Sequence, residues 1–451
     1  MYAEGFRCIG PACEDTCCQG WNVPIDRAAW ERYQSLPQSP LRILMDENIV
    51  RTQRSADAQV DTGAVHELSY ANIRMNGANQ CPFLTEERLC RIQAEMGESQ
   101  LSHACATYPR MVRSVDGVEE KALTLSCPEA VRLVLLTPDL PVNGDGLEGE
   151  STGASEPRDS GSLPGSFWPI RALVLRLVRA RFYPLWQRLF LLDLLCRRLD
   201  SIARGELKRG VPEYLSDFEA AVAGGTLKTT METLPVDRAA QLDVVLRLAG
   251  LMLHKSNVTP RFAECVRAFT AGIGNGPGAT LESLAAHYTL AHDLCYAPFF
   301  DRHPHMMENF LINTIFRCQF PFGKEGLRAG AQPQMTHEFA VLAAQFALMR
   351  GLLIGVAGHY GEAFSAEHVV HTVQAASKHF EHHPEFPSMA HALLMERGMD
   401  GARGLAILLR NAETDRGAGE SRPASPAKYV AERQDGRSVS AVTPAETARP
   451  E

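Results

Sequence analysis

Cysteines concentrated near the N-terminus are the residues best suited to chemistry. Eight of the 12 cysteines lie in the first 127 residues. They are Cys8, Cys13, Cys17, Cys18, Cys81, Cys90, Cys105 and Cys127. The first four follow the spacing C-x4-C-x3-C-C, so their thiols can converge on one centre with little loop entropy to overcome. Because thiolates favour zinc, copper(I) and iron–sulfur centres, the segment predicts a metal or cluster site.

The last two of these cysteines are placed by a predicted β-hairpin. Asp116 and Gly117 form a two-residue turn of the kind that hairpins favour, so the flanking segments are expected to pair. Paired residue numbers then sum to 233, and Cys105 and Cys127 fall almost opposite each other at the open end. Pro109 weakens the pairing there, because it donates no backbone hydrogen bond.

The number of metal sites is left open by the sequence. Cys81 and Cys90 flank a short loop, so the thiols form a group of four, a pair and a hairpin-joined pair. Two four-thiolate sites would use all of them, whereas one would leave four spare. An iron–sulfur cluster is expected, with a closed structural zinc site as the alternative. The radical-type motif C-x3-C-x2-C is not completed, because Gly20 stands at its third position.

Length and composition bound the class of protein. The 451 residues suffice for two or three folding units, and 45% hydrophobic with 22% charged residues is ordinary for a globular protein. The net charge of −8 disfavours nucleic-acid binding, which needs clustered positive charge. No secretory leader is recognised, and the segment taken as most apolar, 185–195, contains charged residues. A cytoplasmic protein with reduced thiols and no membrane insertion is expected.

The chain divides by composition into four parts. Residues 1–136 form a small Cys-rich metal-binding unit, irregular apart from the hairpin. Residues 137–166 are rich in Gly, Ser, Pro and acidic residues, which indicates a flexible linker. Residues 167–411 form a larger all-α unit, and 412–451 a disordered tail. The predicted fold class is therefore mainly α.

Apolar periodicity marks the helices of the large unit. They are predicted at 168–181, from Pro184 through Leu199, and at 242–253, 282–294, 306–316, 339–356 and 366–380. Four cysteines lie singly among apolar neighbours and are expected to pack as small core residues. These are Cys196, Cys265, Cys295 and Cys318.

Several motifs resemble one known family. In the N-terminal unit they are residues 6–21, Cys81-Pro82-Phe83-Leu84, Leu89-Cys90-Arg91-Ile92, residues 101–110 and Leu125-Ser126-Cys127-Pro128-Glu129. In the helical unit they are Arg188-Leu189, residues 308–313 and Phe320-Pro321-Phe322. Together they resemble the flagellin lysine-N-methylases, the FliB family. The cysteine pattern is also similar to small zinc- or iron-chelating domains.

The resemblance implies that S-adenosylmethionine donates methyl groups to flagellin lysines in the bacterial cytoplasm, before export. It also implies that the N-terminal cysteines hold an iron–sulfur cluster, of the 4Fe–4S type, with zinc as the alternative. Flagellin is then the expected partner of a protein-lysine N-methyltransferase. A non-catalytic, metal-stabilised flagellin-binding protein or chaperone is the rival hypothesis, because no ordinary cofactor loop is recognised.

A polar stripe on the 306–316 helix is the candidate catalytic site. His305, Asn309 and Asn313 are spaced at i, i+4 and i+8, and Glu308 lies beside them. Such a stripe either faces solvent or lines a pocket. In the pocket interpretation, favoured by the resemblance, Glu308 and Asn309 are the catalytic candidates, and His305 and Asn313 are cofactor-binding. These groups would bind the substrate ammonium or the amino-acid end of the cofactor.

Three other features have weaker functional interpretations. The glycine-rich segments 272–278 and 355–361 are poor cofactor loops, because each follows a helical stretch and the second more simply ends one. Seven histidines between residues 359 and 391 predict a titrating surface helix rather than a metal site. Arg171, Arg176 and Arg179 are expected on a solvated face.

Overall fold

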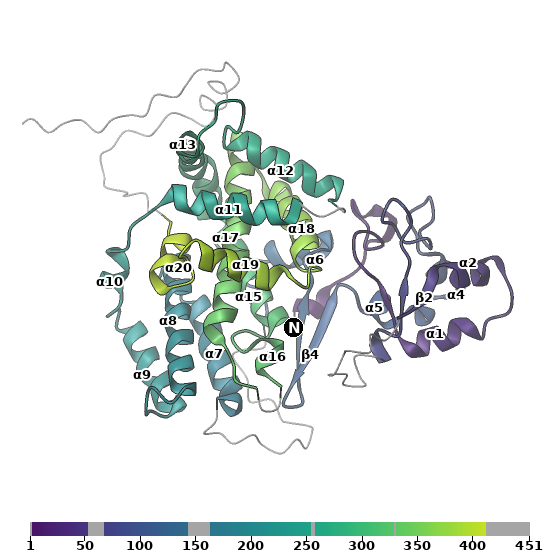
Figure 1. The fold of residues 1–451 in the computed structure, drawn as a ribbon, viewed down its shortest axis with the longest axis horizontal. Helices are drawn as coiled ribbons and strands as arrows, with labels where there is room; N and C mark the ends of the chain where they lie inside the picture. The colour runs from purple at the N-terminus through teal and green to yellow at the C-terminus, as the bar shows by residue number, and fades with distance from the viewer. Residues whose placement is uncertain (1, 53–66, 143–162, 254–257, 329–330, 412–451) are drawn as a thin grey trace, which may run out of the picture.

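The computed structural model is mainly helical, as the sequence predicts (Figure 1). It describes residues 2–52, 67–142, 163–253, 258–328 and 331–411. A helical body carries most of the chain, and a smaller unit with short strands lies at its side. The central part of the predicted linker, 143–162, and the predicted tail, 412–451, lie outside the described residues.

The smaller unit consists of short elements around its own apolar core. They are β1 (Pro24–Ile25), α1 (Arg27–Gln34), α2 (Pro40–Asn48), β2 (Ile49–Arg51), β3 (Ala71–Ile73), α4 (Arg91–Met96) and α5 (His103–Thr107). The strands form an antiparallel sheet in the order β1-β3-β2. Asp26 caps α1, and Ser39 caps α2 ahead of Pro40, which suits a first helical turn. The sheet is missing from the sequence prediction because strands of two or three residues show no periodicity.

The predicted hairpin is confirmed, including its register. Strands β4 (Arg110–Val115) and β5 (Val118–Leu123) are antiparallel, and Arg110 lies opposite Leu123. Asp116 and Gly117 have φ values of 52° and 80°, the positive values that a tight hairpin turn requires. Helix α6 (Pro128–Leu135) follows the hairpin.

Every helix predicted from apolar periodicity is present in the larger unit. Its helices are α7 (Phe167–Val178), α8 (Leu185–Ala203), α9 (Val211–Ala223), α10 (Lys228–Glu232), α11 (Arg238–Leu253), α12 (Pro260–Gly272), α13 (Leu281–Ala291), α14 (Ala297–Arg302), α15 (His305–Cys318), α16 (Gly323–Gly326), α17 (Met335–Tyr360), α18 (Ala366–Phe380), α19 (Phe386–Glu396) and α20 (Ala402–Leu409). A π-helical turn, His292–Tyr296, joins α13 to α14. Of the four single cysteines, Cys196, Cys265 and Cys295 are buried as predicted, and Cys318 is half-buried.

Helix α17 is the centre of the helical body. It packs against α8, α11, α12, α13, α18, α19 and α20, and it is apolar on all sides, as a fully buried helix is. The stretch Met335–Ala363 is long and apolar enough to cross a membrane, but its most apolar window is 100% buried inside the fold. It is more apolar than 185–195, so the choice of that segment as the most apolar was wrong.

The glycines proposed as weak cofactor loops bring two helices together instead. Gly272 ends α12, and Gly355 and Gly358 lie inside α17. A Cβ atom on Gly272 would lie 1.6 Å from the Gly355 carbonyl oxygen, and one on Gly358 would lie 2.9 Å from the Gly272 oxygen. Since only glycine permits such close backbone contact, these residues are explained by the α12–α17 crossing. The helix ends at Tyr360 and not at Gly355.

The two hydrophobic cores do not meet at residue 136, the predicted end of the Cys-rich unit. The core of the smaller unit draws on residues between Val23 and Ile92. Tyr2, Phe6 and the buried side of the hairpin and α6 instead join the core of the helical body. The N-terminal segments are therefore part of both units.

Arg171 belongs to a buried contact, so its prediction as part of a solvated face was wrong. Its side chain is 1% exposed and forms two hydrogen bonds to Glu120 of β5, at 2.8 and 2.9 Å. It also donates to the carbonyls of Ile315 and Phe320. Burial alone raises the pKa of Glu120, and the Arg171 guanidinium opposes this shift. The contact fixes the hairpin on the helical body.

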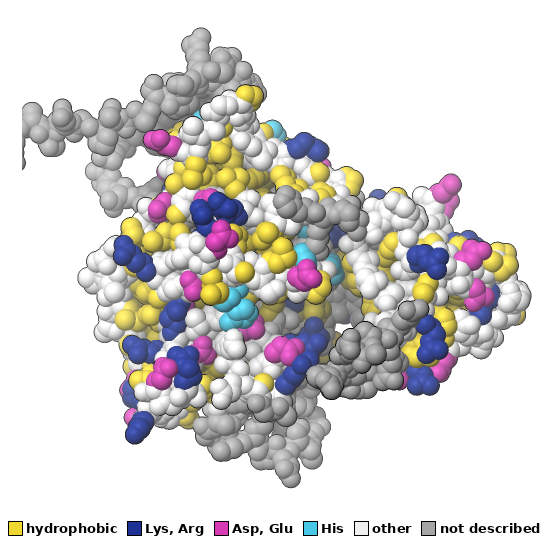
Figure 2. All heavy atoms as spheres, viewed as in Figure 1, with side chains coloured by type: hydrophobic (Ala, Val, Ile, Leu, Met, Phe, Trp, Pro, Cys, Tyr) yellow, Lys and Arg dark blue, Asp and Glu magenta, His cyan; other side chains and the backbone are white. Residues whose placement is uncertain are grey.

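The other two arginines of the predicted face differ from Arg171. Arg176 is exposed and pairs with Glu219 at 2.6 Å, whereas Arg179 donates to the Leu140 carbonyl. On the face shown in Figure 2, acidic and basic side chains are interspersed between hydrophobic areas. Charge is therefore not gathered into a single-sign surface on this face.

Replacing Arg171 by Met would leave Glu120 buried without its cation. We expect R171M to lower the free energy of unfolding by about 3–5 kcal/mol. The matched control, R176M, removes a solvent-exposed ion pair and should change it by less than about 1 kcal/mol. Urea unfolding followed by circular dichroism measures both. Equal effects would show that the buried contact contributes no more than the surface pair.

Candidate functional site

Five of the N-terminal cysteines line one cavity of about 90 Å³ in the smaller unit. They are Cys17, Cys18, Cys81, Cys90 and Cys105. The first two follow the short helix Gly10–Ala12, the next two enclose the loop before α4, and the last lies in α5. The sheet and the first two helices hold these segments together through their common core. The structure thus gathers thiols from three distant segments at one place.

The cavity has the chemistry of a soft-metal site. The side chain of Cys18 interacts with those of Cys17 and Cys81, and burial raises the pKa of the Cys105 thiol to about 11. Neutral thiols must lose protons to become metal ligands. No group of three or more Cys, His, Asp or Glu side chains in the described part of the chain is arranged to hold a metal ion. The iron–sulfur and zinc assignments therefore stay predictions.

The other three N-terminal cysteines lie apart from this cavity. Cys127 occupies the N-cap position of α6. The charges on Cys127 and Cys13 would influence each other, as would those on Cys13 and Cys8. The charge of a Cys17 thiolate would raise the pKa of both the Cys105 and the Cys127 thiols. The C-x4-C-x3-C-C motif is thus divided, because Cys17 and Cys18 line the cavity and Cys8 and Cys13 do not. Likewise, Cys105 lines the cavity and Cys127 does not.

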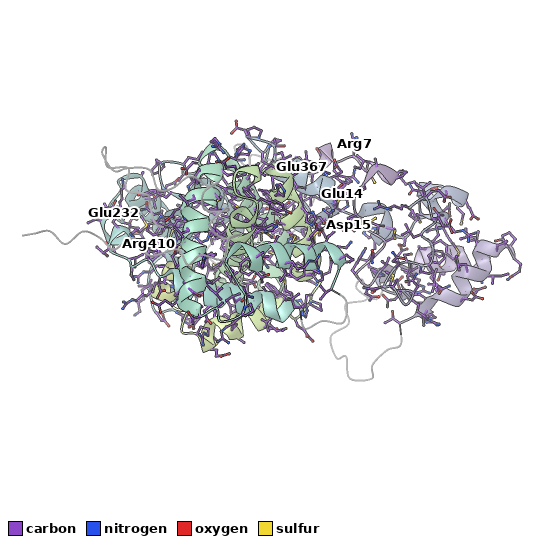
Figure 3. The ribbon with its side chains drawn as sticks, turned by 90° about the horizontal axis from the view of Figure 1, so that it is seen from above. Arg7, Glu14, Asp15, Glu232, Glu367 and Arg410 are labelled. Atoms are coloured by element: carbon purple, nitrogen blue, oxygen red, sulfur yellow. The ribbon has the colours of Figure 1, made fainter. Side chains whose placement is uncertain are left out.

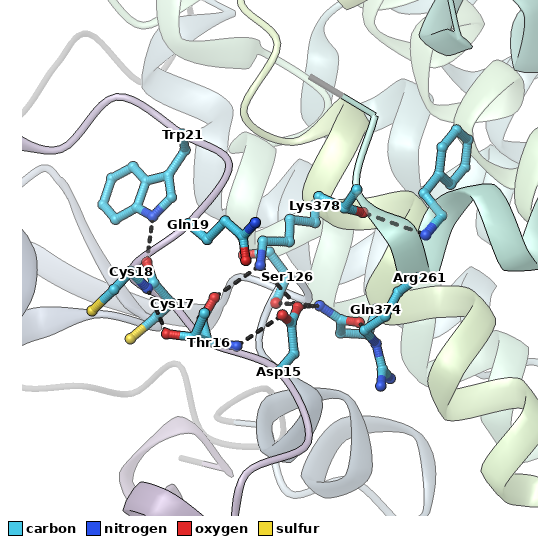
Figure 4. Close-up of polar contacts among 12 residues, drawn as sticks. Asp15, Thr16, Cys17, Cys18, Gln19, Trp21, Ser126, Arg261, Gln374 and Lys378 are labelled. Atoms are coloured by element: carbon cyan, nitrogen blue, oxygen red, sulfur yellow. Dashed lines mark hydrogen bonds and ion pairs between the residues drawn. The ribbon is translucent and has the colours of Figure 1, made fainter. Parts of the chain in front are cut away.

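A buried ion pair anchors the cysteine loop to the helical body (Figure 4). Lys378 of α18 is 5% exposed, and its ammonium group donates to Asp15 Oδ2 and to the Thr16 carbonyl, both at 2.8 Å. Gln374, one turn earlier, donates to the same carboxylate oxygen at 2.6 Å and to the Ser126 carbonyl at 2.9 Å. Although burial opposes ionisation, Lys378 holds the pKa of Asp15 below its ordinary value. Figure 3 places Asp15 at the junction of the two units.

An aromatic stack forms a second contact between the cavity and the helical body. The Trp21 ring lies 5.9 Å from Tyr108 and 5.2 Å from His382, and is roughly parallel to both. The Trp21 indole donates to the Cys17 carbonyl at 2.7 Å. Ser126 Oγ bonds both Tyr108 and His382, at 3.0 and 2.8 Å. The wall of the cysteine cavity is therefore fixed from the helical side.

The predicted catalytic residue Glu308 is buried in an ion-pair network. Its carboxylate is 2% exposed and pairs with Arg181 at 2.9 Å and with Arg188 at 2.7 Å. Arg188 also donates to the carbonyls of Val178 and Tyr183. Glu308 thus joins α15 to the segment between α7 and α8.

The predicted site residues Asn309 and Asn313 bind backbone groups of the N-terminal segments. Asn309 donates to the carbonyls of Val134 and Thr137, at 2.9 and 2.7 Å. Asn313 bonds both backbone groups of Leu123 and accepts from the Tyr2 hydroxyl at 2.6 Å. His305 is half-buried at the start of α15. The stripe therefore holds β5 and α6 in place, and its catalytic and cofactor-binding roles stay predictions.

The histidines between residues 359 and 391 do not form a surface row. His379 and His383 are 8% and 7% exposed, so the surface prediction was wrong for these two. His368 completes the capping box of α18, and His371 lies 3.8 Å from the Glu264 carboxylate. His382 belongs to the aromatic stack. Most of these rings therefore pack or cap structure.

The residues that fix the cysteine loop were not predicted from the sequence. Trp21 and Asp15 lie within the motif itself, so their position next to the thiols was a usable signal. Lys378, Gln374 and His382 are more than 350 residues away in sequence from that loop, as the separation of 363 between Lys378 and Asp15 illustrates. No local pattern distinguishes them from surface polar residues.

Replacing Lys378 by Met should loosen the cysteine loop. Without its cation the half-buried Asp15 carboxylate keeps only the hydrogen bonds from Gln374 and the Thr16 N–H, so the segment leading to Cys17 and Cys18 should open more often. We expect alkylation of these two thiols in metal-free protein to become roughly tenfold faster, equivalent to about 1.4 kcal/mol of local opening. Mass spectrometry of the labelled peptides measures the rate. K324M, at an exposed lysine, is the control, and an unchanged K378M rate would show that the contact does not hold the loop.

His382 should make stability depend on pH. Burial lowers the pKa of His382 to about 4, whereas an unfolded-chain histidine titrates near about 6.5. The unfolded chain therefore takes up a proton first, so stability is full above about pH 6.5 and falls as the pH drops toward 4. We expect the titration of His382 to lower the free energy of unfolding by about 2 kcal/mol as the pH falls from about 6.5 to about 5.

The matched variant for this effect is H382Q, which keeps a polar side chain that does not titrate. Urea unfolding at about pH 7 and about pH 5 should show a smaller loss for H382Q than for the unsubstituted protein. Parallel losses in the two proteins would contradict the assignment to His382.

Comparison with known proteins adds family relationships to this geometry. A sequence model described as the FliB lysine N-methylase C-terminal domain matches residues 171–408, more than half of the chain. The Salmonella muenchen protein named flagellar biosynthetic protein FliU is 30% identical over 145 residues, which cover 32% of this chain and 79% of that protein. No solved structure matches.

Two further relatives are named lysine-N-methylase. They come from Salmonella typhimurium LT2 and Salmonella choleraesuis SC-B67, and each is 29% identical over 139 residues. The matched region covers 31% of this chain and 32% of each of these relatives, so it spans about a third of their length. The domain match extends from Arg171, which binds the hairpin, almost to the end of α20. The chain belongs to the FliB lysine N-methylase family.

Proposed function

We propose that the protein is a protein-lysine N-methyltransferase that acts on flagellin in the bacterial cytoplasm, with S-adenosylmethionine as methyl donor. The observation that carries the proposal is the match of residues 171–408 to the FliB lysine N-methylase C-terminal domain, which supports the reaction class. The five thiols that line one cavity, braced by the helical body, are the residues proposed to hold the iron–sulfur cluster. The flagellar name of one relative supports flagellin as substrate.

The reaction needs a neutral lysine amine, because only that form has a lone pair for attack. A carbon–nitrogen bond forms as the carbon–sulfur bond of the sulfonium breaks, and the bonding electron pair stays on sulfur. The new ammonium then releases a proton to solvent. The sulfonium is already a good leaving group, so positioning the two reactants is the main task of the protein.

The cavity cysteines would hold the metal group. Four of Cys17, Cys18, Cys81, Cys90 and Cys105 can supply the thiolates of a 4Fe–4S cluster, or of zinc as the alternative. Such a group would supply a fixed centre that closes the cavity and orders its walls. The chain itself orients these ligands through Asp15, Lys378 and Trp21.

A second function is favoured by the relative named for flagellar biosynthesis rather than methylation. The match covers 79% of that protein but only 32% of each named methylase. A metal-stabilised protein that binds flagellin without chemistry would fit this pattern. The two functions differ in one measurable property, because only the methyltransferase transfers methyl groups to flagellin.

Incubation of flagellin with anaerobically purified protein and S-adenosylmethionine tests the proposal. Mass spectrometry should show a ladder of methyl additions on lysines. The double variant C18S/C81S should lose at least roughly tenfold in rate, because it removes two thiols from the cavity. C196A, at a buried cysteine of α8, should retain activity. A folded, metal-loaded protein that adds no methyl groups would favour the binding function.

A further inference from the structure

A polar groove lies between the smaller unit and the helical body. Its volume of about 540 Å³ falls in the range of roughly 300–1,000 Å³ that is typical of small-molecule sites. One wall comes from residues 76–88, and the other from 14–16 and the start of α12 at 259–261. Cys81 lines both this groove and the cysteine cavity, so the two spaces adjoin.

The groove combines charges of both signs that form no ion pair at contact distance with the described residues. Arg261, Arg88 and Glu86 all line it, and none forms an ion pair with any residue that the structure describes. Arg261 is held in position by a 2.9 Å hydrogen bond from its Nε to the buried Gln374. Glu86 and Arg88 are exposed on a turn. A ligand can therefore supply the missing counter-charges.

The two remaining acids of the groove already contact cations. Asp15 pairs with Lys378 at 2.8 Å. Glu14 pairs with Arg132 at 2.7 Å, shares that guanidinium with Glu129 and Glu367, and also interacts with the charge of Arg261. Among the described residues that line the groove, Arg88, Arg261 and Glu86 are thus the charged side chains without an ion pair at contact distance. A lysine side chain alone would bring only an ammonium group and would leave both arginines without a partner. A free α-amino-acid group brings a carboxylate and an ammonium together, and so matches the groove.

The uncharged lining also suits a nucleoside. Asn76, Gln19 and Gln80 place amide side chains along the groove. Asn76 Oδ1 and Gln19 Nε2 already bond the local backbone, which leaves the other half of each amide and the Gln80 side chain to pair with a purine edge. Pro82 and Leu84 offer apolar surface beside them. The groove therefore combines what an amino acid joined to a purine nucleoside requires.

We propose that this groove is the S-adenosylmethionine site, with Arg261 and Arg88 binding the carboxylate of the donor and Glu86 its ammonium group. The inference rests on the proposed function, which requires a methyl donor. It accounts for the lack of an ordinary glycine-rich cofactor loop, because side-chain charges at the junction of the two units take over that task. Since Cys81 separates groove and cavity, the donor lies beside the thiols.

Isothermal titration calorimetry on the full chain tests the site. The probes are S-adenosylhomocysteine and 5′-methylthioadenosine, which lacks the amino-acid group. R261Q should weaken S-adenosylhomocysteine binding roughly 10- to 100-fold, and E86Q roughly fivefold, because each removes a charge-assisted hydrogen bond. Neither substitution should change the affinity for 5′-methylthioadenosine by more than about twofold.

Two neighbours serve as matched controls. Glu87 is exposed beside Glu86, and Arg267 is exposed on the same helix as Arg261, but neither lines the groove. E87Q and R267Q should bind both probes as the unsubstituted protein does. Because E86Q changes an exposed turn, it tests the site even where R261Q disturbs Gln374.

The outcomes separate this inference from the proposed function. If R261Q and E86Q both bind S-adenosylhomocysteine with unchanged affinity while the protein methylates flagellin, the groove is not the donor site, and the proposed function stands. If the substitutions weaken the binding of both probes equally, these charged side chains do not bind the amino-acid end of the methyl donor. An unsubstituted protein that binds neither probe and methylates nothing would overturn the proposed function and the groove together.

Discussion

The ion pair between Asp15 and Lys378 is the constraint on which the arrangement of the two units depends. Lys378 is buried and Asp15 half-buried, and the pair joins the loop that carries the first cysteines to α18, 363 positions along the chain. Removing two charges from water is costly unless geometry and hydrogen bonding are nearly complete. Here the carboxylate also accepts from Gln374 and from the Thr16 backbone N–H. The contact is therefore specific for one docking position, because any other position would leave a buried charge without its partner.

The same principle recurs along the whole junction. Glu120 with Arg171, Leu123 with Asn313, and Leu125 with Glu381 each place a polar group of the N-terminal segments against a buried partner on a helix. Hydrophobic burial alone tolerates sliding, whereas paired buried polar groups fix a register. The helical body thus acts as a frame that sets the position of segments whose own core is small. The family match to residues 171–408 covers all of these helical partners.

The sequence predicts those parts of the fold that local physics determines. The long helices follow from apolar periodicity, and the hairpin register follows from the two residues of its turn. Prediction fails where a polar residue meets a partner far away in sequence. Arg171 has the spacing of a surface residue, yet it is paired inside the protein. The buried partners of Glu308 and Asn313 were likewise not predicted, and the site roles of these two residues stay predictions. The cysteines were recognisable by type and spacing, but their division into groups depends on how three separate segments pack.

The packing of these segments fixes the wall of the cysteine cavity. Five thiols line the cavity, and Cys8, Cys13 and Cys127 do not. Trp21 forms part of the wall, and its indole donates to the Cys17 carbonyl. The aromatic stack with His382 and the Asp15–Lys378 contact hold this wall and the cysteine loop in position against the helical body. Because these contacts join residues more than 350 positions apart, the spacing of the cysteines alone does not reveal them.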